Sequence, residues 1–264
     1  QIYLRLKAIF LTDFPIFAYL NMSISPKKLP EINCDLGEGI SGEDSIFPLI
    51  DAASVACGGH FGTEVSILAT LELAQEFGKK AGAHPSYPDK ENFGRVSLKI
   101  TQSELKNSLE KQIEAFLKIA DSLGISMDHI KFHGALYNEA AKDAVLADFL
   151  TDFLLTNWPS VPVFVPPHSF MEEFAIKKGL PYRLEIFGDR AYLDTYQLAP
   201  RSLEGSLLTE KEAVEKHLKS IFFDNCIQSV EGTLLPIQAD TLCFHGDNPG
   251  IHQFLPYLRK TYWT

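Results

Sequence analysis

The sequence predicts an α/β protein, and within that class a seven-stranded (β/α) barrel. Short apolar runs that suit strands alternate along the chain with amphipathic segments that suit helices. Nearly every apolar run ends in glycine or proline beside an ionisable side chain. A barrel binds its ligands at a rim built from many strand ends, whereas an open sheet binds them at one switch point. The distribution of polar strand ends therefore favours the barrel.

Composition limits the partners of the chain. Of its 264 residues 45% are hydrophobic, which is enough for one large core. A formal net charge of -10 argues against nucleic acid and acidic membranes as partners, because its field repels phosphates. No run of about 18 apolar residues occurs, so no membrane-spanning helix is expected.

The cysteines predict a reducing compartment. Cys34, Cys57, Cys226 and Cys243 include no CxxC pair, and three of them fall inside expected strands. Cysteines in such positions are usually small, buried hydrophobic residues. We therefore expect a cytoplasmic protein.

The first 21 residues are expected to lie outside the barrel. Asp13 and Pro15 interrupt their apolar run, and no small-residue cleavage site follows. We interpret residues 1–21 as a non-native or flexible leader and Met22 as the biological start, with an added surface segment as the alternative. Residues 22–264 are then predicted to form a single barrel domain.

The first half of the chain is expected to contain three strands, which end at Asp35, Cys57 and Ala83. Glycine or proline with an ionisable residue follows each of them, namely Glu38, His60 and His84. A helix with apolar residues at helical spacing is expected from Thr63 to Gly78. A second helix is expected to begin at a capping box from Thr101 to Glu104 and to end at Gly124.

The second half is expected to contain four strands, at residues 130–133, 161–165, 182–187 and 241–244. A long helix is expected after the first of these, up to about Trp158, and a short one at 171–178. A further helix is predicted to begin at a capping box, Thr209 to Glu212. In a closing helix, Asn248 is predicted as the cap and Pro249 as the first residue.

Histidines at the strand ends carry the strongest chemical signal. His60, His84, His133 and His245 occupy comparable positions, and core packing alone would rarely place them so. One interpretation is a metal site assembled from different strands, such as Asp35 with His60 or His245. His129 and His133 cannot share an ion on a strand, because they would lie about 13 Å apart.

The alternative is general acid–base catalysis. Asp35, Glu38 or a histidine would move the proton, while Lys131, Arg95 or Arg190 holds an anionic substrate. Alternation along a strand places Asn33 with Asp35, and Lys131 with His133, on common faces. The sequence has no G-x-S-x-G elbow and neither common phosphate loop in the required context, so a nucleotide would have to bind in another way.

Ordered blocks in the sequence resemble those of the LamB/YcsF family. They are Asn33-Cys34-Asp35-Leu36-Gly37-Glu38-Gly39, Ala56-Cys57-Gly58-Gly59-His60, Gly82-Ala83-His84-Pro85-Ser86-Tyr87-Pro88-Asp89, Phe93-Gly94-Arg95, Lys131-Phe132-His133-Gly134-Ala135-Leu136-Tyr137-Asn138, Gly188-Asp189-Arg190-Ala191-Tyr192 and Phe244-His245-Gly246-Asp247-Asn248-Pro249-Gly250. The resemblance implies a seven-stranded β/α barrel related to glycoside hydrolases and polysaccharide deacetylases. Thr63 stands where the family usually has Asp, so no acid acts at that position.

The resemblance also implies an activity, which is the ATP-dependent opening of 5-oxo-L-proline to L-glutamate by a 5-oxoprolinase. It implies two partner subunits, B and C, and ATP as co-substrate; a divalent metal is a further candidate cofactor. The candidate catalytic residues are Asp35, Glu38, His60, His133 and Asp189. The candidate substrate-binding residues are Asn33, His84, Arg95, Lys131, Asn138, Arg190, His245 and Asp247.

Two other functions remain open at this point. The related barrels suggest a metal-dependent deacetylase or amidohydrolase that acts alone. The missing phosphate loop suggests a non-catalytic subunit that binds or channels the substrate, while its partners hold ATP.

Overall fold

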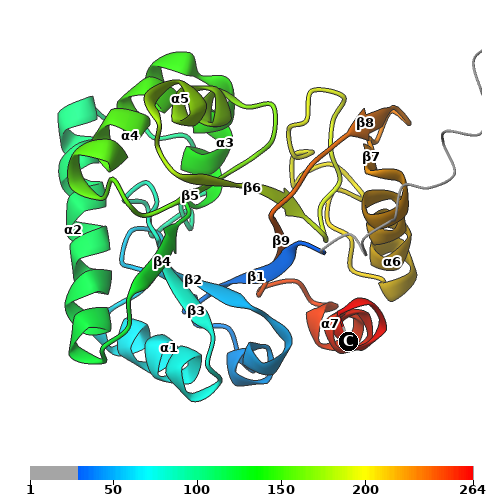
Figure 1. Cartoon of the computed structure of the whole chain (residues 1–264), viewed down its shortest axis with the longest axis horizontal. Coiled ribbons are helices and arrows are strands. Elements are labelled where there is room, and N and C mark those ends of the chain that lie inside the picture. Colours follow the sequence, from blue (N-terminus) through cyan, green and yellow to red (C-terminus); the bar gives the residue numbers. More distant parts are fainter. Residues whose placement is uncertain (1–28, 264) are drawn as a thin grey trace, which may run out of the picture.

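The computed structural model describes residues 29–263, which form a closed barrel of parallel strands with helices around it (Figure 1). The predictions of a leader at 1–21 and a start at Met22 lie outside the described residues. Seven strands close the barrel in the order β1, β2, β3, β4, β5, β6 and β9. The predicted seven-stranded barrel is therefore confirmed.

All barrel strands are parallel, so their carboxyl ends meet at one rim. The strands are β1 (Glu31–Leu36), β2 (Ala52–Ala56), β3 (Lys80–His84), β4 (Met127–Ile130), β5 (Val163–Val165), β6 (Tyr182–Phe187) and β9 (Thr241–His245). β1 pairs with both β2 and β9, which sets Asp35 beside Ser54 on one side and His245 on the other. The closing register thus brings the first and last predicted motifs together.

Helices lie outside the strands and bury their apolar sides against them. They are α1 (Glu64–Glu76), α2 (Gln102–Ser122), α3 (Gly134–Lys142), α4 (Ala144–Asn157), α5 (Phe170–Lys178), α6 (Lys211–Lys219) and α7 (Ile251–Tyr262). The capping box predicted at Thr101 forms, because its side chain accepts from the Glu104 amide while the Glu104 side chain accepts from the Thr101 amide. The buried residues of α2, which include Leu105, Leu109 and Phe116, follow the predicted stripe.

Three helix predictions were wrong in detail. The long helix expected up to Trp158 is two helices, since the Asp143 carboxylate accepts from the amides of Val145 and Leu146 and starts α4 afresh. The capping box predicted at Thr209 does not form, because α6 begins after Glu210 without a side-chain cap. Gly250, and not Asn248, is the cap of α7; the Asn248 side chain instead accepts from the Gly250 amide.

The fourth strand lies three residues earlier than predicted, because β4 spans Met127–Ile130 and not residues 130–133. The next residues still run beside β3, since the amides of Lys131 and His133 donate to the carbonyls of Ala83 and Pro85. Pro85 has no amide hydrogen to complete the ladder, which ends regular pairing there. The predicted common face of Lys131 and His133 holds, since Lys131 pairs with Asp35 and His133 lies 3.5 Å from Glu38.

The chain between β6 and β9 contains a hairpin that was not predicted from the sequence. The hairpin consists of two antiparallel strands, β7 (Cys226–Gln228) and β8 (Leu234–Pro236), separate from the barrel sheet. Cys34, Cys57 and Cys243 are buried free thiols, as expected, and Cys226 is half-buried. No helix among residues 29–263 has the length and apolar character needed to cross a membrane.

Candidate active site

A buried lysine occupies the centre of the barrel. The ammonium of Lys131 lies 2.7 Å from Oδ1 of Asp35, 3.0 Å from Oε1 of Glu185 and 3.0 Å from the thiol of Cys243. Burial favours the neutral amine, but Asp35, Cys243 and Glu185 together outweigh it and hold the pKa of Lys131 well above its ordinary value. Lys131 is therefore positively charged, and its ammonium contacts side chains from other strands of the barrel.

The two carboxylates predicted at the first strand end have opposite proton affinities. Burial raises the pKa of Asp35, yet His84 and Lys131 outweigh it and hold that pKa well below the ordinary range. Burial, together with the charge of Asp35, raises the pKa of Glu38 to about 7. Asp35 is thus ionised at neutral pH, whereas Glu38 exchanges its proton near pH 7. Pairs of this kind often divide base and acid roles.

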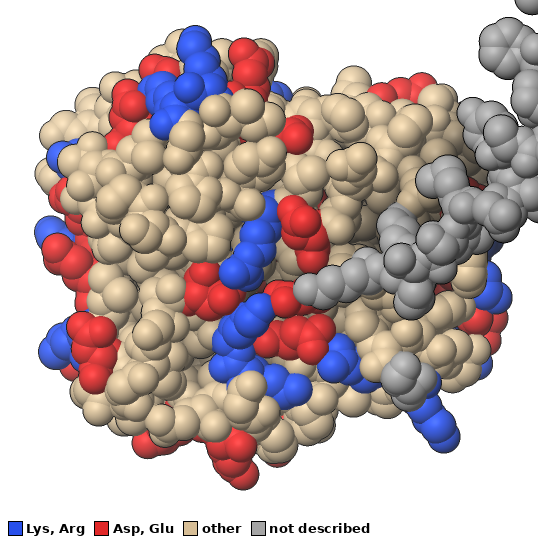
Figure 2. All heavy atoms as spheres, viewed as in Figure 1, with Lys and Arg blue, Asp and Glu red and all other residues tan. Residues whose placement is uncertain are grey.

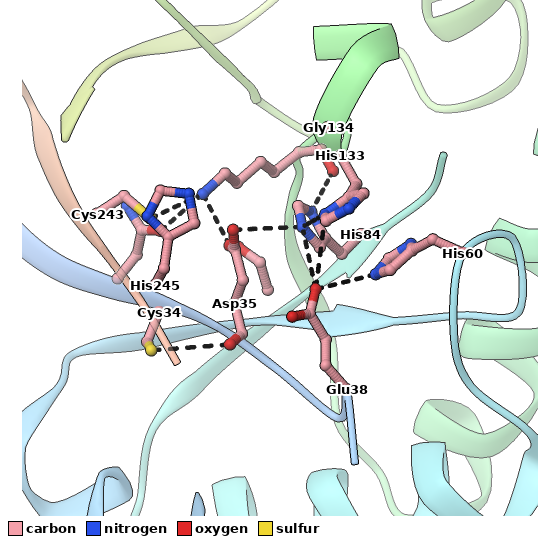
Figure 3. Close-up of polar contacts among 12 residues, drawn as sticks. Cys34, Asp35, Glu38, His60, His84, His133, Gly134, Cys243 and His245 are labelled. Atoms are coloured by element: carbon pink, nitrogen blue, oxygen red, sulfur yellow. Dashed lines mark hydrogen bonds and ion pairs between the residues drawn. The ribbon is translucent and has the colours of Figure 1, made fainter. Parts of the chain in front are cut away.

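Three histidine rings converge on Glu38 (Figure 3). Oε1 of Glu38 lies 2.9 Å from Nε2 of His60, 3.5 Å from Nδ1 of His133 and 4.0 Å from Nε2 of His84. His60 and His133 stack with 3.6 Å between ring centroids, and His84 meets His133 edge-on. Burial lowers the pKa of His60 to about 2 and that of His133 well below its ordinary value. These two rings are neutral at physiological pH.

The loop after the third strand covers this cluster. Phe93 lies in the left-handed region at φ 54°, packs its ring 5.1 Å from that of His60 and offers its carbonyl to Nε2 of His133 at 3.0 Å. At Gly94, with φ 62°, an added Cβ would come within 2.9 Å of His60 and 3.1 Å of His133. Glycine is therefore required for the loop to approach the rings so closely.

A hydrogen bond to Asp189 sets the orientation of His245. Nδ1 of His245 lies 2.9 Å from Oδ1 of Asp189, and the amide of His245 and the side chain of Asn248 donate to Oδ2. Asp189 is fully buried, and although burial opposes its charge, His245 and Asn248 lower its pKa. Asp189 therefore fixes the orientation of the His245 ring and does not itself line the small pocket beside His245.

A small pocket of about 330 Å³ opens above Asp35, His133 and His245. Three guanidinium groups, those of Arg95, Arg190 and Arg201, line it. Arg190 is buried and donates to the carbonyls of Ala199 and Ser206, while Arg95 and Arg201 both pair with Asp247. Ligand pockets start at roughly 300 Å³, so the volume suits a small molecule. Guanidinium groups are suited to bind a carboxylate.

A larger pocket of about 900 Å³ adjoins the small one and shares Tyr137, Asn138 and Phe187 with it. Its lining comes mainly from α3, α5 and the loops after β5 and β6. Neither Asp35 nor any of the histidines that converge on Glu38 lines it. Asp35, His133 and His245 line the smaller pocket, whereas Glu38, His60 and His84 line neither of the two.

The structure brings most predicted site residues together. Asp35, Arg95, His133, Asn138, Arg190 and His245 line the small pocket. Asn33 lies deeper, where its amide donates to Glu185 and Thr241. Asp247 contacts the pocket only through Arg95 and Arg201. The metal set proposed from Asp35, His60 and His245 is not the one that the fold groups, because His60 faces Glu38, His84 and His133 instead.

Sequence reasoning missed three residues of this site, Glu185, Tyr137 and Arg201. Glu185 is a fully buried partner of Lys131, and Tyr137 has a pKa raised well above its ordinary value by burial and by Glu185. A charged residue between Leu184 and Ile186 in an apolar strand was the available signal for Glu185. Arg201 had no signal, since it lies in a long loop.

One known protein family matches nearly all of the described residues. The profile of the LamB/YcsF family matches residues 30–263. The chain belongs to the LamB/YcsF family. Its resemblance to that family in the sequence blocks is confirmed over nearly all of the described residues.

Two curated relatives, each named as the A subunit of a 5-oxoprolinase, match most of the chain. The relative from Syntrophobacter fumaroxidans is 39% identical over 239 residues, which is 89% of this chain and 94% of the relative. The relative from Thermus thermophilus is 37% identical over 235 residues, which is 87% of this chain and 94% of the relative.

Solved structures agree with the fold. The crystal structure of the lactam utilization protein from Thermus thermophilus matches with a TM-score of 0.80 at 34% identity, covering 88% of this chain and 97% of that one. A putative cellobiose-phosphate cleavage protein from Enterococcus faecalis matches with a TM-score of 0.50 at 13% identity, covering 82% and 79%, which is a likeness of fold alone.

Proposed function

We propose that this chain is the subunit of a 5-oxoprolinase that binds 5-oxo-L-proline and opens its lactam ring. The observation that carries the proposal is the small pocket, in which three arginines face the ionised Asp35 and the neutral His133. The names of the curated relatives support the reaction, and the lactam utilization protein supports the class of substrate. The use of ATP and the presence of partner subunits are also part of this proposal.

The arginines are suited to hold the carboxylate of 5-oxoproline. Arg190 is buried and its position is set by two backbone carbonyls, so it can bind an anion without first being ordered. Lys131 was an alternative in the sequence, but two carboxylates already neutralise it below the pocket. We therefore assign Arg190 to the substrate carboxylate, and Lys131 to holding Asp35 ionised.

The reaction requires activation, because an amide carbonyl is a poor electrophile. Transfer of the γ-phosphoryl group of ATP to the lactam oxygen would supply it. Water then adds to the carbonyl carbon, the C–N bond breaks, and the nitrogen takes a proton to become the amine. A second water releases phosphate from the resulting acyl phosphate and leaves L-glutamate, ADP and phosphate.

Asp35 fits the proton transfers. It is ionised and lines the pocket, so it can accept a proton from the attacking water and return it to the leaving nitrogen. His84 lies 3.4 Å from Asp35 and 4.0 Å from Glu38, and so links the two carboxylates. The sequence has neither common phosphate loop, which supports an ATP site on a partner subunit or shared with one.

The test is glutamate release from 5-oxoproline, by the chain alone and mixed with its partner subunits, with and without ATP. Activity is expected only in the complete mixture with ATP. Asp35→Asn should lower it at least about 100-fold, the usual contribution of one acid–base group. Asp51→Asn is the matched control, because Asp51 pairs with Arg259 at the opposite end of the barrel.

Two outcomes would contradict this assignment. Full activity of Asp35→Asn would remove Asp35 from the chemistry, and a loss confined to substrate affinity in both Asp35→Asn and Arg190→Lys would leave the chain as a binding subunit. The buried cluster of Glu38 and three histidines favours a second function, a metal-dependent amide hydrolase that acts alone. Hydrolysis without ATP or partners, and abolished by chelators, would establish that function instead.

A further inference from the structure

We infer that Glu38, His60, His84 and His133 bind one divalent transition-metal ion. Each offers one ligand atom, and these four atoms lie within 4.8 Å of one another. The side chains come from the loops and strand ends that follow β1, β2, β3 and β4, so the closed barrel itself holds them together (Figure 3). All four are buried, which leaves solvent unable to satisfy them.

The hydrogen bonds of two rings leave their inner nitrogens unsatisfied. Nδ1 of His84 lies 2.8 Å from the carbonyl of Lys131, and Nε2 of His133 lies 3.0 Å from the carbonyl of Phe93. A carbonyl only accepts, so in each neutral ring the proton sits on that outer nitrogen. The inner nitrogens, Nε2 of His84 and Nδ1 of His133, then face each other with lone pairs at 2.9 Å. This contact requires a positive charge between or beside them.

A metal ion fits the geometry better than a proton. A shared proton could bridge His84 and His133, but a proton joins only two atoms. Oε1 of Glu38 faces one ring nitrogen of each histidine, at 2.9 Å from His60, 3.5 Å from His133 and 4.0 Å from His84. One cation can contact all four ligand atoms at once, and its charge would be balanced in part by Glu38.

The ligand set indicates the class of metal. Three imidazoles and one carboxylate suit Zn²⁺, Co²⁺ or Ni²⁺, whereas Mg²⁺ and Ca²⁺ prefer oxygen ligands. Metal-binding histidines usually donate their other ring N–H to a carbonyl or carboxylate, which fixes the ring. His84 and His133 do so through the carbonyls of Lys131 and Phe93. The loop that contains Phe93 and Gly94 therefore helps to orient His133, one of the four proposed metal ligands.

The experiment measures metal binding directly, on the full chain and without substrate, ATP or partner subunits. The protein is stripped with a chelator and titrated with Zn²⁺ or Co²⁺, and bound metal is counted by mass spectrometry after gel filtration. We expect about one ion per chain, with a Co²⁺ absorption spectrum typical of four-coordinate nitrogen and oxygen ligands. Glu38→Gln and His133→Asn should each weaken binding at least about 100-fold relative to wild type.

Matched controls keep the test specific to this cluster. His245→Asn alters another histidine at the same rim, paired with Asp189, and His129→Asn alters a buried histidine lower in the barrel. Both should keep about one ion per chain. Circular dichroism checks that each variant is folded, and His84→Asn replaces any variant that is not.

Three results would overturn the inference: no metal retained by the stripped and titrated wild type, wild-type affinity in both Glu38→Gln and His133→Asn, or equal loss of metal in His245→Asn. Because no turnover is measured, failure here is distinguishable from failure of the proposed lactam reaction. Stoichiometric metal in a chain without 5-oxoprolinase activity would sustain this inference while removing that function.

Discussion

The two ends of the barrel differ in how their charged side chains are paired and buried. At the end where the strands begin, charged side chains of both signs alternate across the middle of the face in Figure 2. These side chains form ion pairs with one another, and every pair is partly exposed. The pairs are Lys80 with Glu31, Arg183 with Asp128 and Arg259 with Asp51. At the other end, buried acids, histidines and Lys131 meet below an open pocket. Charged groups at one end therefore form partly exposed pairs, whereas those at the other end are buried beneath a pocket with room for a small molecule.

Two neighbouring histidines show the same contrast. His129 is fully satisfied, because its Nε2 contacts the hydroxyl of Ser54 and its Nδ1 contacts Asp128, while its ring stacks on Phe164. His133 lies four residues later and keeps one nitrogen facing another ring nitrogen at 2.9 Å. A satisfied histidine contributes to stability, whereas an unsatisfied one indicates a site that a ligand completes.

The largest effect on stability is expected from replacing Lys131. Lys131→Met leaves Asp35 and Glu185 buried without their cation, which typically costs about 3–5 kcal/mol. Lys80→Met, the matched change at the opposite end, breaks a partly exposed pair and should cost about 0–1 kcal/mol. Urea denaturation measures both. Equal losses in the two variants would remove the distinction between the ends.

A smaller effect is expected at His129. His129→Asn breaks the contact with Ser54 and should lower the free energy of unfolding by about 1–3 kcal/mol. The same variant should still bind metal, since His129 is not in the cluster with Glu38. Thermal unfolding and metal counting on one preparation test both statements. Loss of metal with an unchanged melting temperature would reverse the roles assigned to His129 and His133.

A pH-dependent effect is expected at Asp51. Burial opposes its charge, but hydrogen bonds from Arg259 and the Ile32 amide lower its pKa. A lowered folded-state pKa stabilises the fold above the unfolded pKa of about 4, and that stabilisation is lost as pH falls toward the folded value. Asp51→Asn should therefore cost on the order of 1 kcal/mol at pH 7, allowing for solvent screening.

The check is the difference in unfolding free energy between wild type and Asp51→Asn across a pH series from neutral to strongly acidic. This difference should shrink steadily below about pH 4. A constant difference over the whole range would mean that Asp51 acts through packing and not through its charge.

The smallest effect is expected on the outer surface. Lys118 and Glu64 join α2 to α1 at 2.7 Å, but each side chain is 69% exposed. Lys118→Ala should change the free energy of unfolding by no more than about 0.5 kcal/mol, because water and salt screen such pairs. A change above about 1 kcal/mol in chemical denaturation would show that exposed pairs matter more here than the comparison of the two ends assumes.

Local patterns in the sequence predicted the barrel, most strand positions and the residues at the strand ends. These are local properties, since alternation, helical spacing and glycine or proline at a turn each depend on a few neighbouring residues. β6 was predicted with its observed bounds, Tyr182–Phe187, and the capping box at Thr101 forms as expected. His60, His84, His133 and His245 were correctly placed at one rim.

Which of those side chains contact one another depends on the three-dimensional arrangement of the strands and loops. The pairing of β1 with β9 sets Asp35 beside His245, yet the loop geometry turns His60 toward Glu38 and away from them. Glu185 lies on β6, and it contacts Lys131 only because β6 is part of the closed barrel. Such contacts depend on strand register and on loop conformation between segments far apart in the sequence, and no local pattern encodes a distance across the barrel.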